Sequence, residues 1–134
     1  MPLVVLTARV GYRDRDSFDV TASTGGAGWG APFAPSWHLL RPLLELQRLE
    51  DLSVEDWSRC VDAYTREMRA SYRANRWAWD RILARRRAVL LCSCATPVRC
   101  HRRVLAEILV QLGAAYGGEL RPVPAQASLP GLGR

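Results

Sequence analysis

The chain contains no lysine, and all 19 of its basic residues are arginine. Set against 13 acidic residues, they give a formal net charge of +6 at pH 7. Arginine carries a planar, permanently charged guanidinium that forms paired hydrogen bonds with phosphate and carboxylate groups. The charge therefore favours an anionic partner, a small molecule, a nucleotide or a nucleic acid, without identifying it.

The sequence also lacks an apolar run of membrane-spanning length, which takes about 20 residues. Its first residues, MPLVVLTARV, show no basic leader and no cleavage site, so we expect no signal peptide, no membrane contact and a cytoplasmic location. The composition is 49% hydrophobic, as in globular proteins. We expect residues 1–122 to form a single domain and residues 123–134, rich in Pro, Gly and Ala, to be disordered.

The pattern of apolar and turn-forming residues predicts a small layered α/β fold with a mostly parallel sheet flanked by helices. The predicted strands cover residues 3–10, 17–21, 88–94 and 119–121. The predicted helices cover residues 37–49, 53–86 with a break near Asn75, and 101–112, with Ser36 as a cap and Gly113 as a stop. A loop rich in Gly and Pro, residues 23–37, separates the second strand from the first helix.

Cysteine and histidine are scarce, with four and two copies, yet three cysteines and one histidine lie in CSCATPVRCHRR, residues 92–103. Ligands bind at the carboxyl ends of the strands of parallel sheets, where this segment is expected to lie. Cys60 lies in a helical pattern and is predicted to be a core or half-buried thiol. Four cysteines in a cytoplasmic chain argue against a disulfide framework.

Metal binding is one possible role for this segment. The candidate ligands are Cys92, Cys94, Cys100 and His101. Their spacing differs from the paired knuckles typical of structural zinc sites, which disfavours a metal without excluding it. No cofactor is expected.

A reactive thiol is the second possibility. Cys100 and His101 stand at a predicted helix start among Arg99, Arg102 and Arg103, and both the helix dipole and the cations lower a thiol's pKa. The stretch from Cys94 to Arg99 resembles, over six residues, the active-site loop of rhodanese-type sulfurtransferases. Two thiols this close can also form a reversible disulfide.

An anion pocket without covalent chemistry needs the fewest assumptions. The arginines, His101 and the helix start would supply its donors. It also remains open that Cys92 and Cys94 only pack as small buried residues while the arginines are solvated.

The segment VLLCSCATPVRCHRRVLAEIL is similar to the signature of the bacterial and phage "domain of unknown function 488" family. That family has a strand ending in Leu-Cys, a short loop and a Cys-His-Arg that opens a helix. The stretches FDVT, FAPSW and YTREMRASYRANRWAW resemble a subgroup of it, so the resemblance spans roughly residues 3–121. It implies an α/β fold and brings no established reaction.

By position, the resemblance assigns Cys92, Cys100, His101 and Arg102 to the family signature. Asp19 matches an acidic residue that ends the second strand. Many members have an acidic residue where this chain has Cys94. The resemblance therefore favours a mechanism built on Cys100, His101, Arg102 and Asp19 over one that rests on Cys94. If the strands are parallel, Asp19 is expected to approach and orient His101.

A different class of function, nucleic-acid binding, is indicated by two further features. Arginines recur along the second predicted helix at three- and four-residue steps, at Arg59, Arg66, Arg69, Arg73 and Arg76, a pattern that can track phosphates. A solvated face with an Asp62–Arg66 ion pair is the simpler explanation. In the tail, QASLPGL (Gln126–Leu132) resembles the short peptides that dock on the replication sliding clamp.

Three hypotheses follow. The first is an anion-binding pocket with thiol-dependent chemistry on a phosphorylated or nucleotide-like ligand. Its catalytic residues would be Cys100, His101 and Asp19, and its ligand-binding residues Arg99, Arg102, Arg103, Cys92 and Cys94. The second is a nucleic-acid-associated module using Arg66, Arg69, Arg73, Arg76 and the clamp-like tail. The third is a structural metal-binding protein. The sequence does not decide whether the protein is an enzyme.

Overall fold

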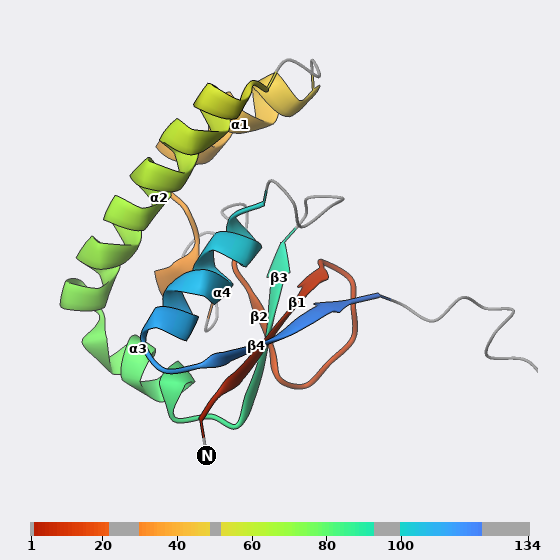
Figure 1. Cartoon of the computed structure of the whole chain (residues 1–134), viewed down its shortest axis with the longest axis vertical. Coiled ribbons are helices and arrows are strands. Elements are labelled where there is room, and N and C mark those ends of the chain that lie inside the picture. Colours follow the sequence, from red (N-terminus) through yellow and green to blue (C-terminus); the bar gives the residue numbers. More distant parts are fainter. Residues whose placement is uncertain (1, 22–29, 49–51, 93–99, 122–134) are drawn as a thin grey trace, which may run out of the picture.

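A four-stranded, entirely parallel sheet forms the centre of the protein (Figure 1), which confirms the predicted α/β class. The structure is a computed structural model, and it describes residues 2–21, 30–48, 52–92 and 100–121. The strands, in the spatial order β2-β3-β1-β4, are β1 (Val4–Arg9), β2 (Ser17–Asp19), β3 (Arg87–Cys92) and β4 (Ala115–Leu120). The helices are η2 (Ala31–Phe33), α1 (Trp37–Arg48), α2 (Val54–Ala74), α3 (Arg76–Leu83) and α4 (His101–Gln111).

The two central strands, β1 and β3, are apolar on both faces. Val5, Ala88 and Leu90 pack under the helices, whereas Ala8 and Val89 pack in a smaller cluster on the opposite face. Near-continuous apolar runs of this kind are typical of central strands in parallel sheets. Because all four strands run in the same direction, their carboxyl ends meet at one edge of the sheet.

The edge strand β4 is longer than the predicted strand at residues 119–121. Its register against β1 shifts between Val5 and Leu6, opposite two consecutive glycines. A Cβ on Gly117 would lie 2.7 Å from the Leu6 side chain, and Gly118 has a φ of +112°. Glycine weakens the strand pattern and marks a bulge, which is why the sequence pattern missed the first half of β4.

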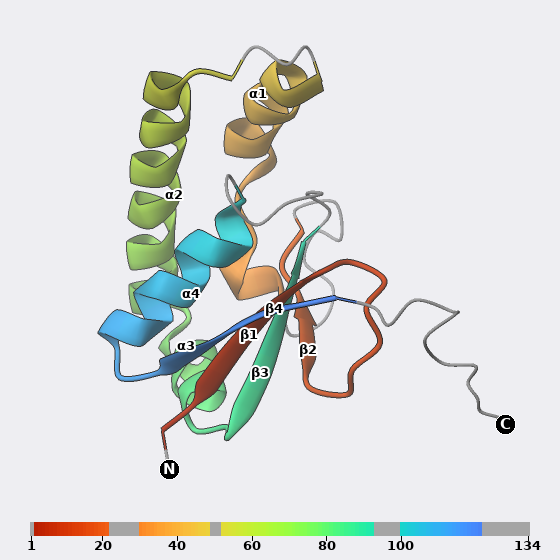
Figure 2. The same cartoon turned by 45° about the vertical axis from the view of Figure 1, so that its right-hand side comes forward.

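The helices cover one face of the sheet in two layers (Figures 1 and 2). Helix α4 packs on the sheet, α2 lies beside α4, and α1 packs beside α2. The main core lies beneath them and includes Phe33, Tyr64, Trp79 and Leu105. Among the described residues, no helix combines the length and apolar character needed to cross a membrane.

Helix boundaries follow the predicted caps. The Ser36 hydroxyl accepts a hydrogen bond from the Leu39 amide at 3.2 Å. Ser53 and Asp56 form a reciprocal capping box at the start of α2. The chain breaks between α2 and α3 at Asn75, as predicted. These local contacts set the start and end of α2, the helix that faces α4.

Several sequence predictions concern residues outside the described ranges. They include residues 23–29 of the Gly-rich loop, Cys94, Arg99 and the clamp-like peptide at Gln126–Leu132. Those predictions stay open.

We predict that Ser53→Ala lowers the free energy of unfolding by about 1 kcal/mol, because the Asp56 amide loses its capping acceptor. Ser58→Ala is the matched control, since Ser58 is exposed in the interior of the same helix, where alanine is favoured. Chemical denaturation of both variants measures the difference. Equal stability of the two variants would contradict the assigned helix start.

Candidate functional site

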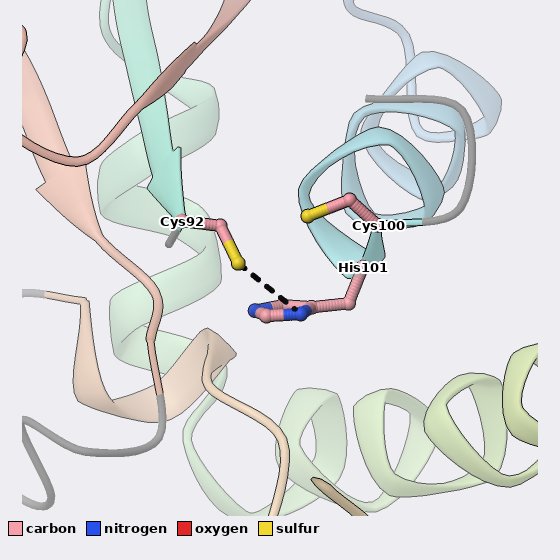
Figure 3. Close-up of side chains that lie close together, drawn as sticks. All are labelled: Cys92, Cys100 and His101. Carbon is pink, nitrogen blue, oxygen red and sulfur yellow. Dashed lines mark hydrogen bonds between the residues drawn. The ribbon is translucent and has the colours of Figure 1, made fainter. Parts of the chain in front are cut away.

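Four side chains that can form polar contacts meet where β3 ends and α4 begins, at the carboxyl edge of the sheet. Cys92 is the last residue of β3, Cys100 is the residue before α4, and His101 and Arg102 form its first turn. All four side chains are buried, with exposed fractions of 1%, 0%, 4% and 0%. Figure 3 shows Cys92 pointing from the strand toward Cys100 and His101 of the helix. We call these four residues the Cys-His-Arg cluster.

The ring of His101 is held by hydrogen bonds at both nitrogens. Nε2 lies 2.9 Å from the backbone oxygen of Val20, and Nδ1 lies 3.5 Å from the Cys92 sulfur. A carbonyl oxygen can only accept a hydrogen bond, so Nε2 must carry the proton. In the neutral ring Nδ1 is then an acceptor and faces the Cys92 thiol. The fold therefore selects the tautomer that can take a proton from Cys92.

Helix α2 supplies the wall on the other side of His101. The Tyr64 ring meets the imidazole edge-on, with 5.5 Å between the ring centroids. Its hydroxyl donates to the backbone oxygen of Phe33 at 2.6 Å. Burial raises the pKa of Tyr64 well above 10.0, so Tyr64 remains a neutral donor. The imidazole thus has little freedom to rotate away from Cys92.

Arg102 links the cluster to β4. Its Nη1 donates to the Cys100 sulfur at 3.3 Å, while Nε and Nη2 donate to the two carboxylate oxygens of Glu119 at 3.3 and 2.7 Å. Burial alone would raise the pKa of Glu119, but hydrogen bonds from Arg102 and Thr7 lower it below its ordinary 4.5. Burial likewise opposes the charge on Arg102, yet the hydrogen bond to Glu119 raises the pKa of Arg102 above its ordinary value. Both members of the pair are therefore ionised.

Three of these groups also form a potential metal site. The ligand atoms of Cys92, Cys100 and His101 all lie within 4.8 Å of one another. Tetrahedral zinc, with Zn–S of about 2.3 Å and Zn–N of about 2.0 Å, places S and N ligands about 3.5 Å apart, which matches the Cys92–His101 distance. The contact of Nε2 with a backbone carbonyl is the outer partner typical of a metal-binding histidine.

Two other sequence-predicted site residues lie apart from the cluster. Asp19 pairs in register with Leu91, whose side chain belongs to the opposite face of the sheet, and its Oδ1 accepts from the Thr21 amide at 2.9 Å. The group from this segment that reaches His101 is the Val20 carbonyl. Arg103 stacks on the Tyr116 ring, with its guanidinium carbon 3.9 Å from the ring centroid.

The arginines of α2 are exposed, as a solvated face requires. Arg59 pairs with Asp56, and Arg76, which is the first residue of α3, pairs with Asp80 at 2.9 Å. Arg76 also stacks on Tyr72. Within the described ranges, no contact joins Arg66 to Asp62, so the predicted ion pair at that step is not formed.

Sequence reasoning missed three contributors to the site. The Val20 carbonyl is a backbone group and leaves no residue-type signal. Tyr64 lies on the buried face of α2, where its residue type and spacing indicate only a core position. Glu119 was the first residue of the last predicted strand, at 119–121. The strand in fact begins at Ala115, which places Glu119 near its carboxyl end, at the edge that the parallel strand ends share.

Comparison with known proteins identifies one similarity. A family model described as DUF488-N3a, the active DUF488-N3 subclade, matches residues 5–113. The matched range includes the whole Cys-His-Arg cluster but stops before Glu119. No curated protein and no solved structure matches the chain.

We predict that Arg102→Met lowers the free energy of unfolding by about 3 kcal/mol, the low end of the range for a buried pair, because it leaves the Glu119 carboxylate, whose side chain is 15% exposed, without its partner. The double variant Arg102→Met/Glu119→Leu should recover most of that loss, since no buried charge remains. Denaturation of the single and double variants at pH 7 measures the coupling. Additive losses in the double variant would show that the pair is not coupled.

The pH dependence provides a second check on this prediction. Because the pKa of Glu119 is lowered in the folded state, the stability it contributes is complete above pH 4.5 and is lost as the pH falls through its folded value. The double variant should therefore lose less stability between neutral pH and the acid range than the wild type does. An unchanged acid dependence would contradict an ionised Glu119.

Proposed function

The chain belongs to the DUF488-N3 subclade of the domain-of-unknown-function 488 family, and from this membership and the buried cluster we propose that it is a thiol-dependent enzyme. Its ligand would be a phosphorylated or nucleotide-like anion. In this proposal Cys92 is the reactive thiol, His101 is its base, and Cys100 with Arg102 forms the neighbouring wall of the pocket.

The observation that carries the proposal is the orientation of His101. With Nε2–H donated to the Val20 carbonyl, Nδ1 is free to accept the proton of the Cys92 thiol. Proton transfer leaves a thiolate on Cys92 beside an imidazolium, and the imidazolium keeps its hydrogen bond to Val20. A lone pair of the thiolate sulfur can then attack an electrophilic atom of the ligand. As the bond from sulfur forms, the bond from that atom to its leaving group breaks, and the leaving group departs with the bonding electrons and takes the proton from Nδ1 of the imidazolium. This is the arrangement of nucleophile, base and orienting group that thiol catalysis requires.

Two features of the fold favour negative charge at the cluster. The Arg102 guanidinium contacts the Cys100 sulfur, although Glu119 offsets part of its charge. The first turn of α4 presents backbone N–H groups that have no acceptor within the helix, and the helix dipole adds to their effect. Both support a thiolate or the anionic group of a ligand.

Simple core packing does not account for these residues. Burying an imidazole and a guanidinium is unfavourable unless each finds partners, and apolar side chains at positions 101 and 102 would avoid that cost. Here His101 and Arg102 are both fully partnered, and both partners lie at the edge where parallel sheets bind ligands. Polar groups that are costly to bury and mutually arranged are more typical of a functional site.

Alkylation mapping tests the proposal. Iodoacetamide labelling of the native protein at pH 7, followed by peptide mass spectrometry, gives the rate at each cysteine. Reagent access differs between the buried Cys92 and the half-buried Cys60, so the comparison is made at one position. We expect Cys92 of the wild type to react at least about tenfold faster than Cys92 of the variant His101→Gln, which lacks the proposed base. The ultraviolet absorbance of the thiolate supplies a readout that does not depend on reagent access.

Substitutions assign the effect to the proposed pair. His101→Gln should slow alkylation of Cys92 and abolish the thiolate absorbance that Cys92→Ser also removes. His38→Gln is the matched control, because His38 is exposed on α1. If His101→Gln and His38→Gln behave alike, or if no thiolate is present at pH 7, the base–nucleophile pair is refuted.

A second candidate function, structural metal binding, is favoured by the convergence of Cys92, Cys100 and His101. If it holds, protein purified without added metal should contain about one zinc per chain, and a chelator should lower its Tm. Cys100→Ser should lose the metal, whereas Cys60→Ser should retain it. A metal-free protein with no zinc-dependent change in Tm would eliminate this candidate.

A further inference from the structure

A groove follows the seam between α2 and α4, which lie side by side in both overall views (Figures 1 and 2). It consists of two cavities of about 300 and 240 Å³. The cavities lie next to each other, since both are lined by Thr65, Arg69, Ile108 and Gln111. We call this feature the α2–α4 groove.

The groove leads to the Cys-His-Arg cluster. Cys100 lines the larger cavity together with Trp57 and Arg103. The smaller cavity continues along α2 to Tyr72 and Arg73. With a rise of about 1.5 Å per residue, the stretch of α2 from Trp57 to Tyr72 is about 22 Å long. That length exceeds what a single nucleotide occupies.

The charges on the groove are mostly positive. Arg69, Arg73 and Arg103 line it, and Glu107 is the acidic residue among its described lining residues. Within the described part of the chain, no carboxylate pairs with Arg69 or Arg73. These two arginines are one helical turn apart, about 5–6 Å between their Cβ atoms, which is of the order of the spacing of successive phosphates in an extended strand.

The groove also offers surfaces for bases. Trp57 is half-buried at the end nearest the cluster, and Val61 and Ile108 give the floor an apolar character. Nucleic-acid bases stack on aromatic side chains without regard to sequence, while arginines hold the backbone. Cavities of about 300 and 240 Å³ are of a size that holds single nucleotides and not a duplex.

We propose that the α2–α4 groove binds single-stranded nucleic acid. Phosphates lie on Arg69, Arg73 and Arg103, a base stacks on Trp57, and the strand brings one nucleotide to the cluster end of the groove beside Cys100. The inference rests on the proposed function in one respect: it names single-stranded nucleic acid as the substrate class of the proposed thiol chemistry. Binding by the groove does not itself require a reactive thiol.

Fluorescence anisotropy with a labelled oligothymidylate of about 15 nucleotides tests the proposal. The variant Arg69→Gln/Arg73→Gln removes two phosphate contacts and should weaken binding about tenfold or more at low salt. It should also reduce the slope of log K against log salt by about 1.4, which is two contacts at about 0.7 each for a single strand. Trp57→Leu should weaken binding without changing the slope.

The matched control is Arg13→Gln/Arg15→Gln, which removes the same charge from exposed positions between β1 and β2. It should change the affinity less than about twofold. Equal losses in the two double variants would show that net charge, and not the groove, binds the strand. The proposal is overturned if no strand binds at low salt, or if a duplex binds with equal affinity. It is also overturned if an acidic peptide displaces the bound strand completely.

A protection experiment separates this inference from the proposed function. Bound oligothymidylate should slow alkylation of Cys100 in the wild type but not in Arg69→Gln/Arg73→Gln. If the strand binds through the groove while Cys92 shows no thiolate, the groove assignment stands and the thiol chemistry fails. If Cys92 is reactive but no strand binds through the groove, the proposed function stands and the groove assignment is refuted.

Discussion

The hydrogen bond between His101 Nε2 and the Val20 carbonyl sets the chemistry of the buried site. It fixes which ring nitrogen carries the proton, and so it makes Nδ1 the acceptor that faces Cys92. A backbone carbonyl serves this purpose without adding a charge to a buried pocket. Rotation of the ring is further limited by Tyr64, so the proton relationship between His101 and Cys92 follows from the fold itself.

The start of α4 is held from two strands at once. The segment after β2 contacts His101 through Val20, and β4 contacts Arg102 through Glu119. Since β2 and β4 are the two edge strands of the sheet, these contacts bridge its full width at the carboxyl edge. The position of Cys100 between them therefore depends on the all-parallel arrangement and on the bulge that brings Glu119 into register with Thr7.

The sequence predicted the fold class, the helix caps and the segment that carries the cluster, because each rests on local patterns. It could not predict the partners of that segment, since these depend on which strands become neighbours. Asp19 was expected near His101 because it matches an acidic residue of the family and because the ends of parallel strands meet at one edge. Strand alternation instead puts Asp19 in register with Leu91 on the opposite face, and the Val20 carbonyl meets the imidazole.

The same limit applies to the arginines of α2. Their spacing indicated a basic face, but only the packing of α4 shows that Arg69 and Arg73 line a groove that Arg66 does not.

The central claim remains the tautomer of His101, and nitrogen-15 NMR of the two imidazoles measures it directly. The account predicts that His101 carries a proton on Nε2, as the neutral tautomer or as imidazolium, with exposed His38 as the internal reference. A neutral His101 protonated at Nδ1 would contradict it.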